Sequence, residues 1–504
     1  MALMTEKLRA IMAIDPARTQ IDFAGQEYSW GQIAAAVTAI ESALDGMGLP
    51  QDARVGVMLR NRPGHVAAII AVLSTDRCLV TLNPILPDER LFADIEGLSL
   101  PVIIADASDM ARPGLADSLA RAGSAAIEID PLLGPVRLLP GREAPAPNVP
   151  VKLSPGVAIE MLTSGTTGTP KRVPLTRVAF DASFAGFTRY ERGREFGDAP
   201  QLRSGVTMVV NPLTHIGGIY GCIAALAAGR KIALLEKFSV DSWIDTVRRH
   251  RPKVAPAVPS AVRMLLEADV AAEDLSSLSS LISGTAPLPP DLVDAFYEKY
   301  GIPICGNYGA TEFAGAIAGW SIDDFRARWT EKRGAVGRVH ADVEARVVDP
   351  ESGAILPPGQ EGLLEIKGAQ LSNDMQWLRT TDRAILDEDR YLWIMGRADN
   401  AIIRGGFKVH PDDVVKALHD HPDIREAAVV GVPDARLGQV PAAAIILREG
   451  ATAPDPDALS SFLRERLIAY AVPVHVRFVK DFPRTPSMKP STPGLQALFA
   501  EQSA

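Results

Sequence analysis

The chain has 504 residues, of which 47% are aliphatic or aromatic and 22% are charged, so it is long enough for about three structural units with sizeable hydrophobic cores. Lys and Arg number 52 and Asp and Glu number 61, a net charge of −9, which argues against nucleic acid as the main partner because phosphate backbones attract basic surfaces. Three scattered cysteines, Cys78, Cys222 and Cys305, form neither a disulfide framework nor a zinc motif and indicate a reducing compartment.

The N-terminal residues have helical spacing and acids but no apolar region of the kind found in a signal peptide. The longest weakly polar run, residues 216–228, contains Gly217, Gly218 and Gly221 and is shorter than the roughly 20 apolar residues of a membrane span. We therefore expect a cytoplasmic protein without a membrane span.

A capping box opens the first strong helical pattern. Ser29 and Gln32 have the required spacing, and Ile33, Val37, Ile40 and Leu44 follow at helical intervals. Beyond this helix we expect strands at 55–59, 79–82 and 102–105 and a helix at 65–73. Alternating strands and helices favour a mostly parallel sheet covered on both faces.

The alternation resumes after the proline-rich residues 140–150. We expect strands at 207–210, 231–235 and 281–283, separated by helices at 240–250, 260–268 and 290–300. Between Gly334 and Gly368 the pattern changes, because strand-like residues 346–348 and 363–366 flank the turn-rich residues 349–353. This region predicts antiparallel strands or a small barrel.

The last hundred residues read as a separate small α+β domain that begins near Asn400, after a hinge close to residues 396–399. A helix over 411–420 opens with Pro411 and acids, as helix N-termini prefer. Strands at 427–432 and 442–447 and a helix at 459–468 follow.

The strongest chemical signal is the segment Thr163-Ser-Gly-Thr-Thr-Gly-Thr-Pro-Lys171. Its hydroxyls and open glycine amides can surround phosphate oxygens, and Lys171 adds positive charge. The spacing is not that of a Walker loop, because Gly165 to Lys171 reads GxxGxxK. The alternative is a flexible, hydroxyl-rich linker.

This segment resembles the phosphate loop of the adenylate-forming superfamily, which contains acyl- and aryl-CoA synthetases, nonribosomal-peptide adenylation domains and firefly luciferase. Seven further segments resemble that superfamily's motifs, in the same order: 212–218 (acyl pocket), 283–288 (adenine strand end), 307–312 (aromatic-Gly-x-Thr-Glu), 377–382 (ribose aspartate), 396–399 (hinge), 405–411 (the following loop) and 483–489 (catalytic lysine). Coincidence is a poor account of so many ordered matches.

The resemblance implies a role for individual residues. The triphosphate would be held by Thr163, Ser164, Gly165, Thr166, Thr167, Gly168 and Lys171, and the adenine by Gly284, Thr285, Ala286, Pro287, Asn307, Tyr308 and Gly309. Thr311 would bond the α-phosphate, Glu312 would hold Mg2+, and Asp382 and Arg397 would meet the ribose. Lys489 would be the catalytic lysine, Asp399 the hinge, and Gly405 and Gly406 would approach the thiol.

Each assignment has a plainer alternative from the residues alone. Taken alone, Tyr308 would be interpreted as a core tyrosine and Lys489 as a surface lysine. Glu312 can be a surface acid, and Asp382 with Arg383 can be a turn with an exposed ion pair. His215 either lines the acid pocket or is a core histidine, and the sequence favours neither.

Four positions depart from the superfamily's usual pattern. Thr381 and Met488 stand where a glycine is usual, before the ribose aspartate and the catalytic lysine respectively, and Pro490 follows that lysine. Residues 371–375 replace the usual Gly-Tyr-Trp stretch. These departures bear on the adenylation rate rather than on the fold.

The resemblance also implies an α/β fold. A large N-terminal domain (residues 1–396) of doubly wound mixed sheets plus a small barrel would be joined by a hinge (397–399) to a small mobile α+β domain (400–504) that carries Lys489. The implied function is an ATP-dependent acid–CoA ligase that uses ATP, Mg2+ and CoA. The alternatives are an adenylating enzyme that loads a carrier protein and a degenerate adenylate-binding protein, and a homodimer stays open.

The acid itself is only partly indicated. Residues 214–220 contain no aspartate, which disfavours an amino acid, and residues 313–317 contain no lysine or arginine, which disfavours a dicarboxylate such as malonate. The neighbouring Ile216, Ile219, Phe313 and Ala314 favour an apolar acid, either aromatic or of medium chain length.

Overall fold

The computed structural model describes residues 3–147, 149–163, 171–188, 195–371, 375–405, 407–434, 436–485 and 488–500. Contacts divide the chain into two units. Unit 1 comprises the described residues within 1–164, 170–343 and 367–376, and unit 2 those within 344–366 and 377–500. The fold is α/β with several mixed sheets, as predicted. The domain boundary at residues 397–399 stays a prediction.

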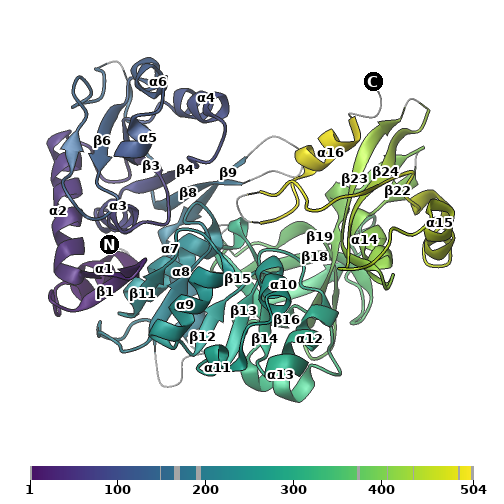
Figure 1. The fold of residues 1–504 in the computed structure, drawn as a ribbon. Helices are drawn as coiled ribbons and strands as arrows, with labels where there is room; N and C mark the ends of the chain where they lie inside the picture. The colour runs from purple at the N-terminus through teal and green to yellow at the C-terminus, as the bar shows by residue number, and fades with distance from the viewer. Residues whose placement is uncertain are drawn as a thin grey trace. The chain divides into compact units, whose positions relative to one another are not determined.

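A seven-stranded sheet of unit 1 has the order β7-β6-β5-β3-β4-β8-β9 (Figure 1). Its strands are β3 (Arg54–Met58), β4 (Cys78–Leu82), β5 (Val102–Asp106), β6 (Ala125–Ile129), β7 (Arg137–Leu138), β8 (Val157–Thr163) and β9 (Lys171–Thr176). The strands β6, β5, β3, β4 and β8 run parallel, while β7 and β9 are antiparallel to their neighbours. Sequence periodicity predicted β3, β4 and β5 to within a residue or two.

The helices of this layer are α2 (Trp30–Gly46), α3 (Pro63–Ser74), α4 (Asp88–Leu98), α5 (Ala107–Met110) and α6 (Leu115–Ala122). The predicted capping box of α2 is confirmed, because the Ser29 hydroxyl accepts from the Gln32 N–H and the Gln32 side chain accepts from the Ser29 N–H. Every residue of α3 is buried. A helix that is apolar all round suits such a central position, and α3 contacts both α2 and the strands β3, β4 and β5.

A four-stranded sheet of unit 1 has the order β10-β11-β1-β2, made of β1 (Thr19–Phe23), β2 (Gln26–Ser29), β10 (Val206–Val209) and β11 (Lys231–Leu234). Its helices are α1 (Leu3–Met12), α7 (Arg177–Thr188) and α8 (Ile216–Ala227). The first turn of α1 is tied to α7, because the backbone N–H groups of Leu3 and Met4 donate to the Asp181 carboxylate at 3.0 Å. One hydrophobic core joins these helices to α2 and α3.

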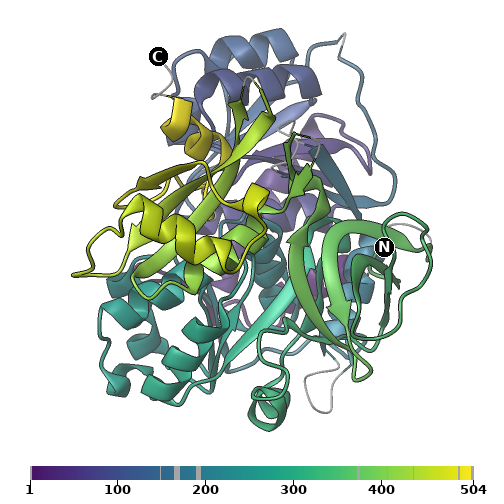
Figure 2. The same cartoon turned by 90° about the vertical axis from the view of Figure 1, so that its right-hand side faces the viewer.

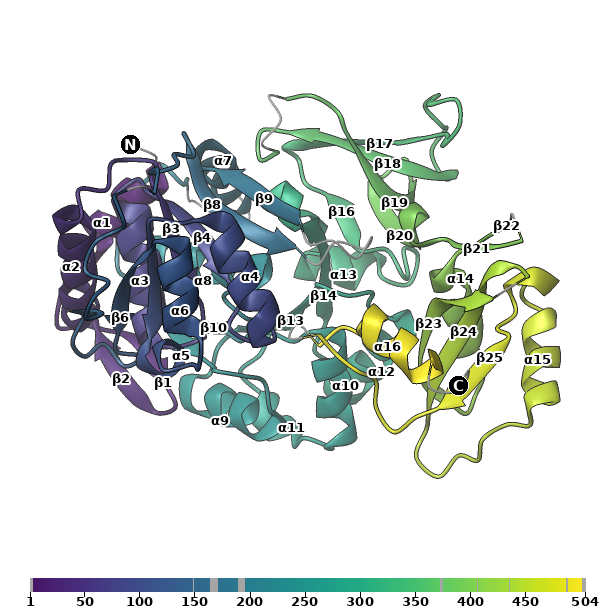
Figure 3. The same cartoon turned by 90° about the horizontal axis from the view of Figure 1, so that it is seen from above.

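Five further strands of unit 1 follow in the order β12-β13-β14-β15-β16. They are β12 (Val254–Pro256), β13 (Ser280–Ser283), β14 (Ile304–Ala310), β15 (Gly315–Gly319) and β16 (Gly337–Val339). The first three run parallel and the rest antiparallel. Figure 1 shows them beside α9 (Val240–His250), α10 (Pro259–Glu267), α11 (Ala272–Leu275), α12 (Pro290–Tyr300) and α13 (Ile322–Arg328), and Figure 3 shows β13, β14 and β16 from above. The short 3-10 helix η1 (Thr311–Phe313) joins β14 to β15.

Unit 2 begins with strands in the order β20-β19-β18-β17. They are β17 (Val343–Val348), β18 (Glu361–Gly368), β19 (Leu378–Leu386) and β20 (Tyr391–Arg397), followed by the 3-10 helix η2 (Ala398–Asn400). The ladders from β18 to β20 are antiparallel. This change from parallel to antiparallel pairing agrees with the turn-rich pattern of residues 346–366.

The remaining strands of unit 2 form a sheet of order β22-β21-β24-β23, with β25 also paired to β24. They are β21 (Ile402–Arg404), β22 (Phe407–Val409), β23 (Ile424–Asp434), β24 (Gly438–Leu447) and β25 (His475–Phe478), accompanied by α14 (Pro411–His419), α15 (Pro456–Arg464), α16 (Thr492–Ala500) and η3 (Ala469–Ala471). Figure 2 shows these helices in yellow-green and yellow against strands of similar colour. Alternate residues of β23 and β24 point to opposite faces, so α14 and α15 cover one core and α16 the other.

One predicted boundary was wrong. The helix expected at 459–468 ends at Arg464, and Ala469–Ala471 form a 3-10 turn instead. Leu467 and Tyr470 still pack on the core beside α14, so their apolar spacing reflects burial and not a helix. Within the described residues, no helix is both long enough and apolar enough to cross a membrane.

Candidate functional site

The ends of the hydroxyl-rich segment are brought together by the antiparallel pair β8–β9. Thr163 at the end of β8 is the register partner of Lys171 at the start of β9. The predicted phosphate residues Ser164, Gly165, Thr166, Thr167 and Gly168 lie outside the described residues, as does the Thr163 side chain. Lys171 is exposed at the start of β9. The residues before and after this segment are therefore neighbours at one end of the β8–β9 pair.

Gly284 and the Asn307 side chain lie in close contact. They lie on parallel neighbours, since Ser283 of β13 pairs with Gly306 of β14. A Cβ atom at Gly284 would lie 2.1 Å from the Asn307 Oδ1 atom. A side chain at position 284 would therefore displace the Asn307 amide from the predicted adenine strand end.

Two hydroxyls at this strand end are buried without a hydrogen-bond partner among the described residues: Ser283 Oγ and Thr285 Oγ1. Thr285 also has a left-handed backbone, with φ of +69°, which a residue with a Cβ rarely adopts. A buried polar atom without a partner costs free energy. Ala286 and Pro287 follow directly, so the unpaired hydroxyls and the strained backbone mark the position where the sequence predicts adenine.

Tyr308 lies at an irregularity of the β14–β15 ladder. The register shifts between Tyr308 and Gly309. A Cβ atom at Gly309 would lie 2.3 Å from the Gly315 carbonyl oxygen, so only glycine allows this approach. The half-buried Tyr308 ring lies 6.0 Å from the Phe313 ring, inclined by 60°.

The helix η1 carries the predicted phosphate and magnesium residues Thr311 and Glu312. Thr311 is half-buried and Glu312 is exposed. The helix lies against β9, the strand that begins with Lys171. A buried side chain that the sequence did not single out steadies it: Gln370 Nε2 donates to the carbonyl oxygens of Phe313 at 2.8 Å and Ala316 at 3.2 Å.

The N-terminus of α8 completes this group of elements in unit 1. His215 is the N-cap residue and is half-buried, and its N–H donates to the Pro212 carbonyl at 2.9 Å. A Cβ atom at Gly217 would lie 3.6 Å from Thr285 Cγ2. The predicted acyl-pocket segment and the predicted adenine strand end are therefore in contact.

Three of the four side chains expected beside the acid are buried. Ile219 and Ala314 have no exposed surface and belong to the large core of unit 1, and Phe313 is buried as well. The apolar character of these three residues therefore reflects packing in the protein interior and not contact with the acid. Ile216 is half-buried.

An aromatic group lies beside the start of β15. A Cβ atom at Gly315 would lie 3.3 Å from the Tyr220 ring and 2.9 Å from Ser183 Oγ. The Tyr220 hydroxyl bonds Ser183 at 3.1 Å, and the Phe184 ring lies 4.7 Å from the Tyr220 ring. Burial raises the pKa of Tyr220 well above its ordinary value, so this phenol stays neutral.

The predicted ribose residues of unit 2 lie on the β19–β20 ladder. Asp382 and Arg397 are register partners. The Arg397 guanidinium donates to both carboxylate oxygens of Asp399, at 2.8 and 2.7 Å, and to the Thr381 hydroxyl at 2.5 Å. Thr381, which stands where glycine is usual, thus fixes the arginine that the sequence placed near the ribose.

Lys489 lies in a tight loop closed by Thr485. The Thr485 N–H donates to the Lys489 carbonyl at 2.7 Å, and the Lys489 N–H donates to the Thr485 hydroxyl at 3.2 Å. Met488 has φ of +63°, a conformation that favours glycine. Burial and, to a smaller extent, the positive charge of Arg397 lower the pKa of Lys489 below its ordinary value.

Gly405 also has a left-handed backbone, with φ of +56°, and its N–H donates to the Leu437 carbonyl at 2.8 Å. Its neighbour Gly406 lies outside the described residues. The structure thus groups the predicted residues within each unit: Lys171, Gly284, Asn307, Tyr308, Thr311 and His215 with their neighbours in unit 1, and Asp382, Arg397, Asp399, Gly405 and Lys489 in unit 2.

Comparison with known proteins gives independent evidence of the family. Residues 8–374 match the family model described as AMP-binding enzyme, and residues 414–489 match the AMP-binding enzyme C-terminal domain. A rice (Oryza sativa subsp. japonica) protein named 4-coumarate–CoA ligase 3 is 28% identical over 498 residues, covering 94% of this chain and 88% of its own.

Two solved structures are similar over almost the full length. ATP-bound MatB from Rhodopseudomonas palustris has a TM-score of 0.81 at 25% identity, with 100% of both chains covered. An amide bond synthetase from Marinactinospora thermotolerans has a TM-score of 0.78 at 28% identity, covering 99% of this chain and 100% of its own. The chain therefore belongs to the AMP-binding enzyme family, within the adenylate-forming superfamily.

Proposed function

We propose that this chain is an ATP-dependent acid–CoA ligase. It would adenylate an apolar carboxylic acid, transfer the acyl group to CoA, and release AMP and pyrophosphate. The observation that carries the proposal is the strand end of unit 1, where the unpaired hydroxyls of Ser283 and Thr285 adjoin the Gly284–Asn307 contact in a chain that matches the AMP-binding model.

The residues present fit a nucleoside triphosphate. Tyr308 offers a half-buried aromatic face to a flat base, and the unpaired hydroxyls offer hydrogen bonds to its edge. The segment 163–171 would bind the triphosphate, and Thr311 the α-phosphate. Asp382 would accept from the ribose hydroxyls, beside the Arg397–Asp399 pair.

Glu312 would hold Mg2+, whose role is to neutralise the charge that builds on the departing pyrophosphate. Among the described residues no group of three or more His, Cys, Asp or Glu could hold a metal ion. One exposed carboxylate is nevertheless enough, because Mg2+ in such sites keeps several waters and binds substrate phosphates.

Little acid–base chemistry is required of the protein. A substrate carboxylate, with a reference pKa near ~4, is already ionised at neutral pH and attacks the α-phosphorus directly. Lys489 would supply positive charge to the phosphoryl oxygens during this step. CoA then attacks the acyl carbonyl and AMP departs. We propose that the small domain, residues 400–504, turns about a hinge at Asp399 between the two steps.

The class of acid rests on the aromatic group of Phe184 and Tyr220 beside Gly315, together with the lack of a basic residue at 313–317. An aromatic or medium-chain acid suits these apolar surroundings better than a dicarboxylate, because the second charge of a dicarboxylate would need a partner. The rice relative is named for an aromatic acid, 4-coumarate.

Pyrophosphate release over a panel of aryl, cinnamyl and fatty acids, with and without CoA, tests the proposal. We expect acid-dependent release with one or more apolar acids and formation of the matching thioester when CoA is added. A product formed only with a carrier protein, or only with an amine, would replace CoA as the acceptor. Binding of ATP with no acid-dependent release would overturn the ligase proposal in favour of a non-catalytic adenylate-binding protein.

A further inference from the structure

Asn61 lies between β3 and α3, outside every motif discussed above, yet its side chain bonds two separate stretches of backbone, residues 210–213 and Leu235. It is 4% exposed. Its Nδ2 atom donates to the carbonyl oxygens of Asn211 at 3.1 Å and Leu235 at 3.0 Å. Its Oδ1 atom accepts from the Leu213 N–H at 2.8 Å. Both ends of the amide are therefore used.

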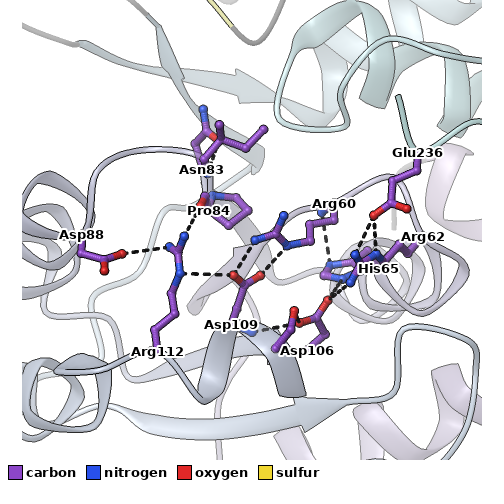
Figure 4. A network of polar contacts seen from close by, with 12 residues as sticks. Arg60, Arg62, His65, Asn83, Pro84, Asp88, Asp106, Asp109, Arg112 and Glu236 are labelled. Atoms are coloured by element: carbon purple, nitrogen blue, oxygen red, sulfur yellow. Dashed lines mark hydrogen bonds and ion pairs between the residues drawn. The ribbon is translucent and has the colours of Figure 1, made fainter. Parts of the chain in front are cut away.

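Charged contacts on both sides hold the loop that carries Asn61 (Figure 4). Arg60 donates to both carboxylate oxygens of Asp109, at 2.8 and 2.7 Å. Arg62 donates to Asp106 at 2.8 Å and to Glu236 at 2.8 and 2.6 Å. Asp106 and Asp109 are buried, and bidentate arginine–carboxylate pairs fix orientation as well as distance.

A buried histidine adds a further link. The Arg60 N–H donates to His65 Nδ1 at 3.4 Å, and His65 Nε2 lies 3.2 Å from an Asp106 carboxylate oxygen. The short segment Arg60–Arg62 is thus held to β5, α5 and α3 on one side. On the other side Arg62 bonds Glu236, and the central residue, Asn61, bonds the adjacent Leu235 and residues 211–213.

The backbone held by Asn61 leads directly into the predicted acid pocket. Leu213 is followed by Thr214 and His215, and α8 begins at Ile216. The turn has no spare room: a Cβ atom at Gly218 would lie 2.2 Å from the Pro212 carbonyl and 2.5 Å from the Asn211 carbonyl. A shift of this backbone would therefore move His215 and Gly217 together.

An asparagine suits this position better than its close relatives. A leucine would leave the Leu213 N–H without its acceptor, and an aspartate would place negative charge beside carbonyl oxygens that need a donor. The amide alone satisfies a donor and two acceptors at once. The start of α3 does not need it, because Pro63 begins that helix and Arg62 is its N-cap.

We propose that Asn61 is a positioning residue for the acid pocket: it holds the backbone of residues 210–213 so that His215 and the first turn of α8 face the carboxylic acid. This role rests on the proposed ligase function. Both ends of the Asn61 amide bond backbone atoms, so its loss should weaken binding of the acid while leaving binding of ATP unaffected.

Asn61→Ala tests the role, with Gln20→Ala as its matched control. Gln20 is a buried amide of unit 1 whose Nε2 donates to the Arg230 carbonyl at 2.6 Å, next to the start of β11, whereas Asn61 bonds Leu235 next to its end. Loss of the Asn61 bonds should raise the KM of the acid about tenfold, because the backbone that leads to His215 and the first turn of α8 is then no longer held in place. The KM of ATP should change less than twofold, and Gln20→Ala should alter neither.

Hydrogen exchange supplies a readout that does not need activity. Amides of residues 211–218 should exchange faster in Asn61→Ala than in wild type or Gln20→Ala. If Asn61→Ala does not accumulate as folded protein, Asn61→Ser, which keeps one donor and one acceptor, takes its place in both measurements.

The outcomes separate the two proposals. A wild type that releases no pyrophosphate with any acid overturns the ligase function. An active wild type with an unchanged acid KM in Asn61→Ala, or with both KM values raised equally, overturns the positioning role alone. Exchange at 211–218 that matches Gln20→Ala also overturns it.

Discussion

Lys489 is the residue whose replacement distinguishes best between the two half-reactions. Because the proposed mechanism places its charge where negative charge builds on the phosphoryl oxygens, Lys489→Ala should slow adenylation by about 10²-fold or more. Thioester formation from added acyl-adenylate should change less than about threefold, because that step makes no new phosphoryl charge. Single-turnover assays of each half-reaction give the two rates.

Lys489→Arg is the control, since it keeps the charge but not the shape of the lysine. An equal loss in both half-reactions of Lys489→Ala would contradict the assignment of Lys489 to adenylation. Because burial and Arg397 lower the pKa of Lys489, adenylation by wild type should fall at high pH before an ordinary lysine deprotonates. Lys489→Arg should not show this fall.

Gly284 tests the adenine strand end. In Gly284→Ala the new Cβ would overlap Asn307 Oδ1, so Asn307 or the strand must move. We expect the KM of ATP to rise about tenfold or more, with a smaller change in the KM of the acid. Steady-state kinetics at saturating co-substrate measure both.

The matched control is Gly46→Ala, at the end of α2, where nothing lies within 4 Å of the new Cβ. Alanine favours helix over glycine, so this variant should be neutral or more stable by up to about 1 kcal/mol. An unchanged ATP KM in Gly284→Ala would remove that strand end from the nucleotide site.

Some of these residues were readable from the sequence and others were not. Gly284, Asn307 and Lys489 lie in motifs of recognisable spacing, and the φ of Met488 now explains why glycine is usual there. Asn61 and Gln370 gave no signal. Their side chains bond backbone atoms some 50 to 170 positions away, and such pairings leave no local pattern.

At the scale of elements, Asp106 joins the end of β5 to the start of α3. Burial alone would raise the pKa of Asp106, but hydrogen bonds from His65, Ser108 and the Asp109 N–H outweigh it and lower the pKa well below its ordinary value. A carboxylate with a lowered pKa stabilises the fold above its unfolded pKa of about 4, and that contribution is lost as the pH falls further.

Asp106→Asn should therefore lower the free energy of unfolding by about 3 kcal/mol at pH 7, because Arg62 loses a buried ionic partner. The difference from wild type should shrink below pH 4. Urea titrations at several pH values measure it. The exposed Asp117→Asn of α6 is the control and should change stability by less than about 0.5 kcal/mol. A difference that grows on acidification would contradict the linkage.

Helices with clear start signals were predicted well, as α2, α9 and α12 show. The helix α8 was not predicted, because Gly217, Gly218 and Gly221 hide its apolar spacing. Its glycines are explained only by the folded structure, in which Gly218 meets the carbonyls of residues 211 and 212. The pair β1–β2 escaped for a different reason, since each strand is short and half of β2 is exposed.

For the molecule as a whole, the three cysteines report how often unit 1 opens. Burial raises the pKa of Cys78 and Cys222 to about 12 and that of Cys305 to about 11, so almost no thiolate exists in the folded state. A thiol reagent should therefore react slowly with native protein and fast with all three thiols in denaturant.

ATP should slow this labelling further, because a ligand that binds only the folded state stabilises it by mass action. At an ATP concentration 100 times its Kd, the rate should fall about a hundredfold where labelling requires unfolding of unit 1. Protein without ATP, to which only pyrophosphate is added, serves as the comparison. Labelling that ATP leaves unchanged would contradict nucleotide binding to the folded chain.

The overall architecture was foreseeable to the level of α/β layers but not of sheet order. Alternating strands and helices predicted parallel pairing, yet nothing local indicates that β3 lies between β4 and β5, or that β1 pairs with β11 some 200 residues away. Such pairings are set by long-range packing of apolar faces. The domain boundary at residues 397–399 remains a prediction of the sequence.

One property of the Asn61 contacts bears on how acid preference can change over evolutionary time. Every atom that Asn61 bonds belongs to the main chain, so these hydrogen bonds do not depend on which side chains residues 212–217 carry. Thr214, His215 and Ile216 can therefore be exchanged while the turn keeps its course. A library randomised at these three positions would explore new acids on an unaltered frame.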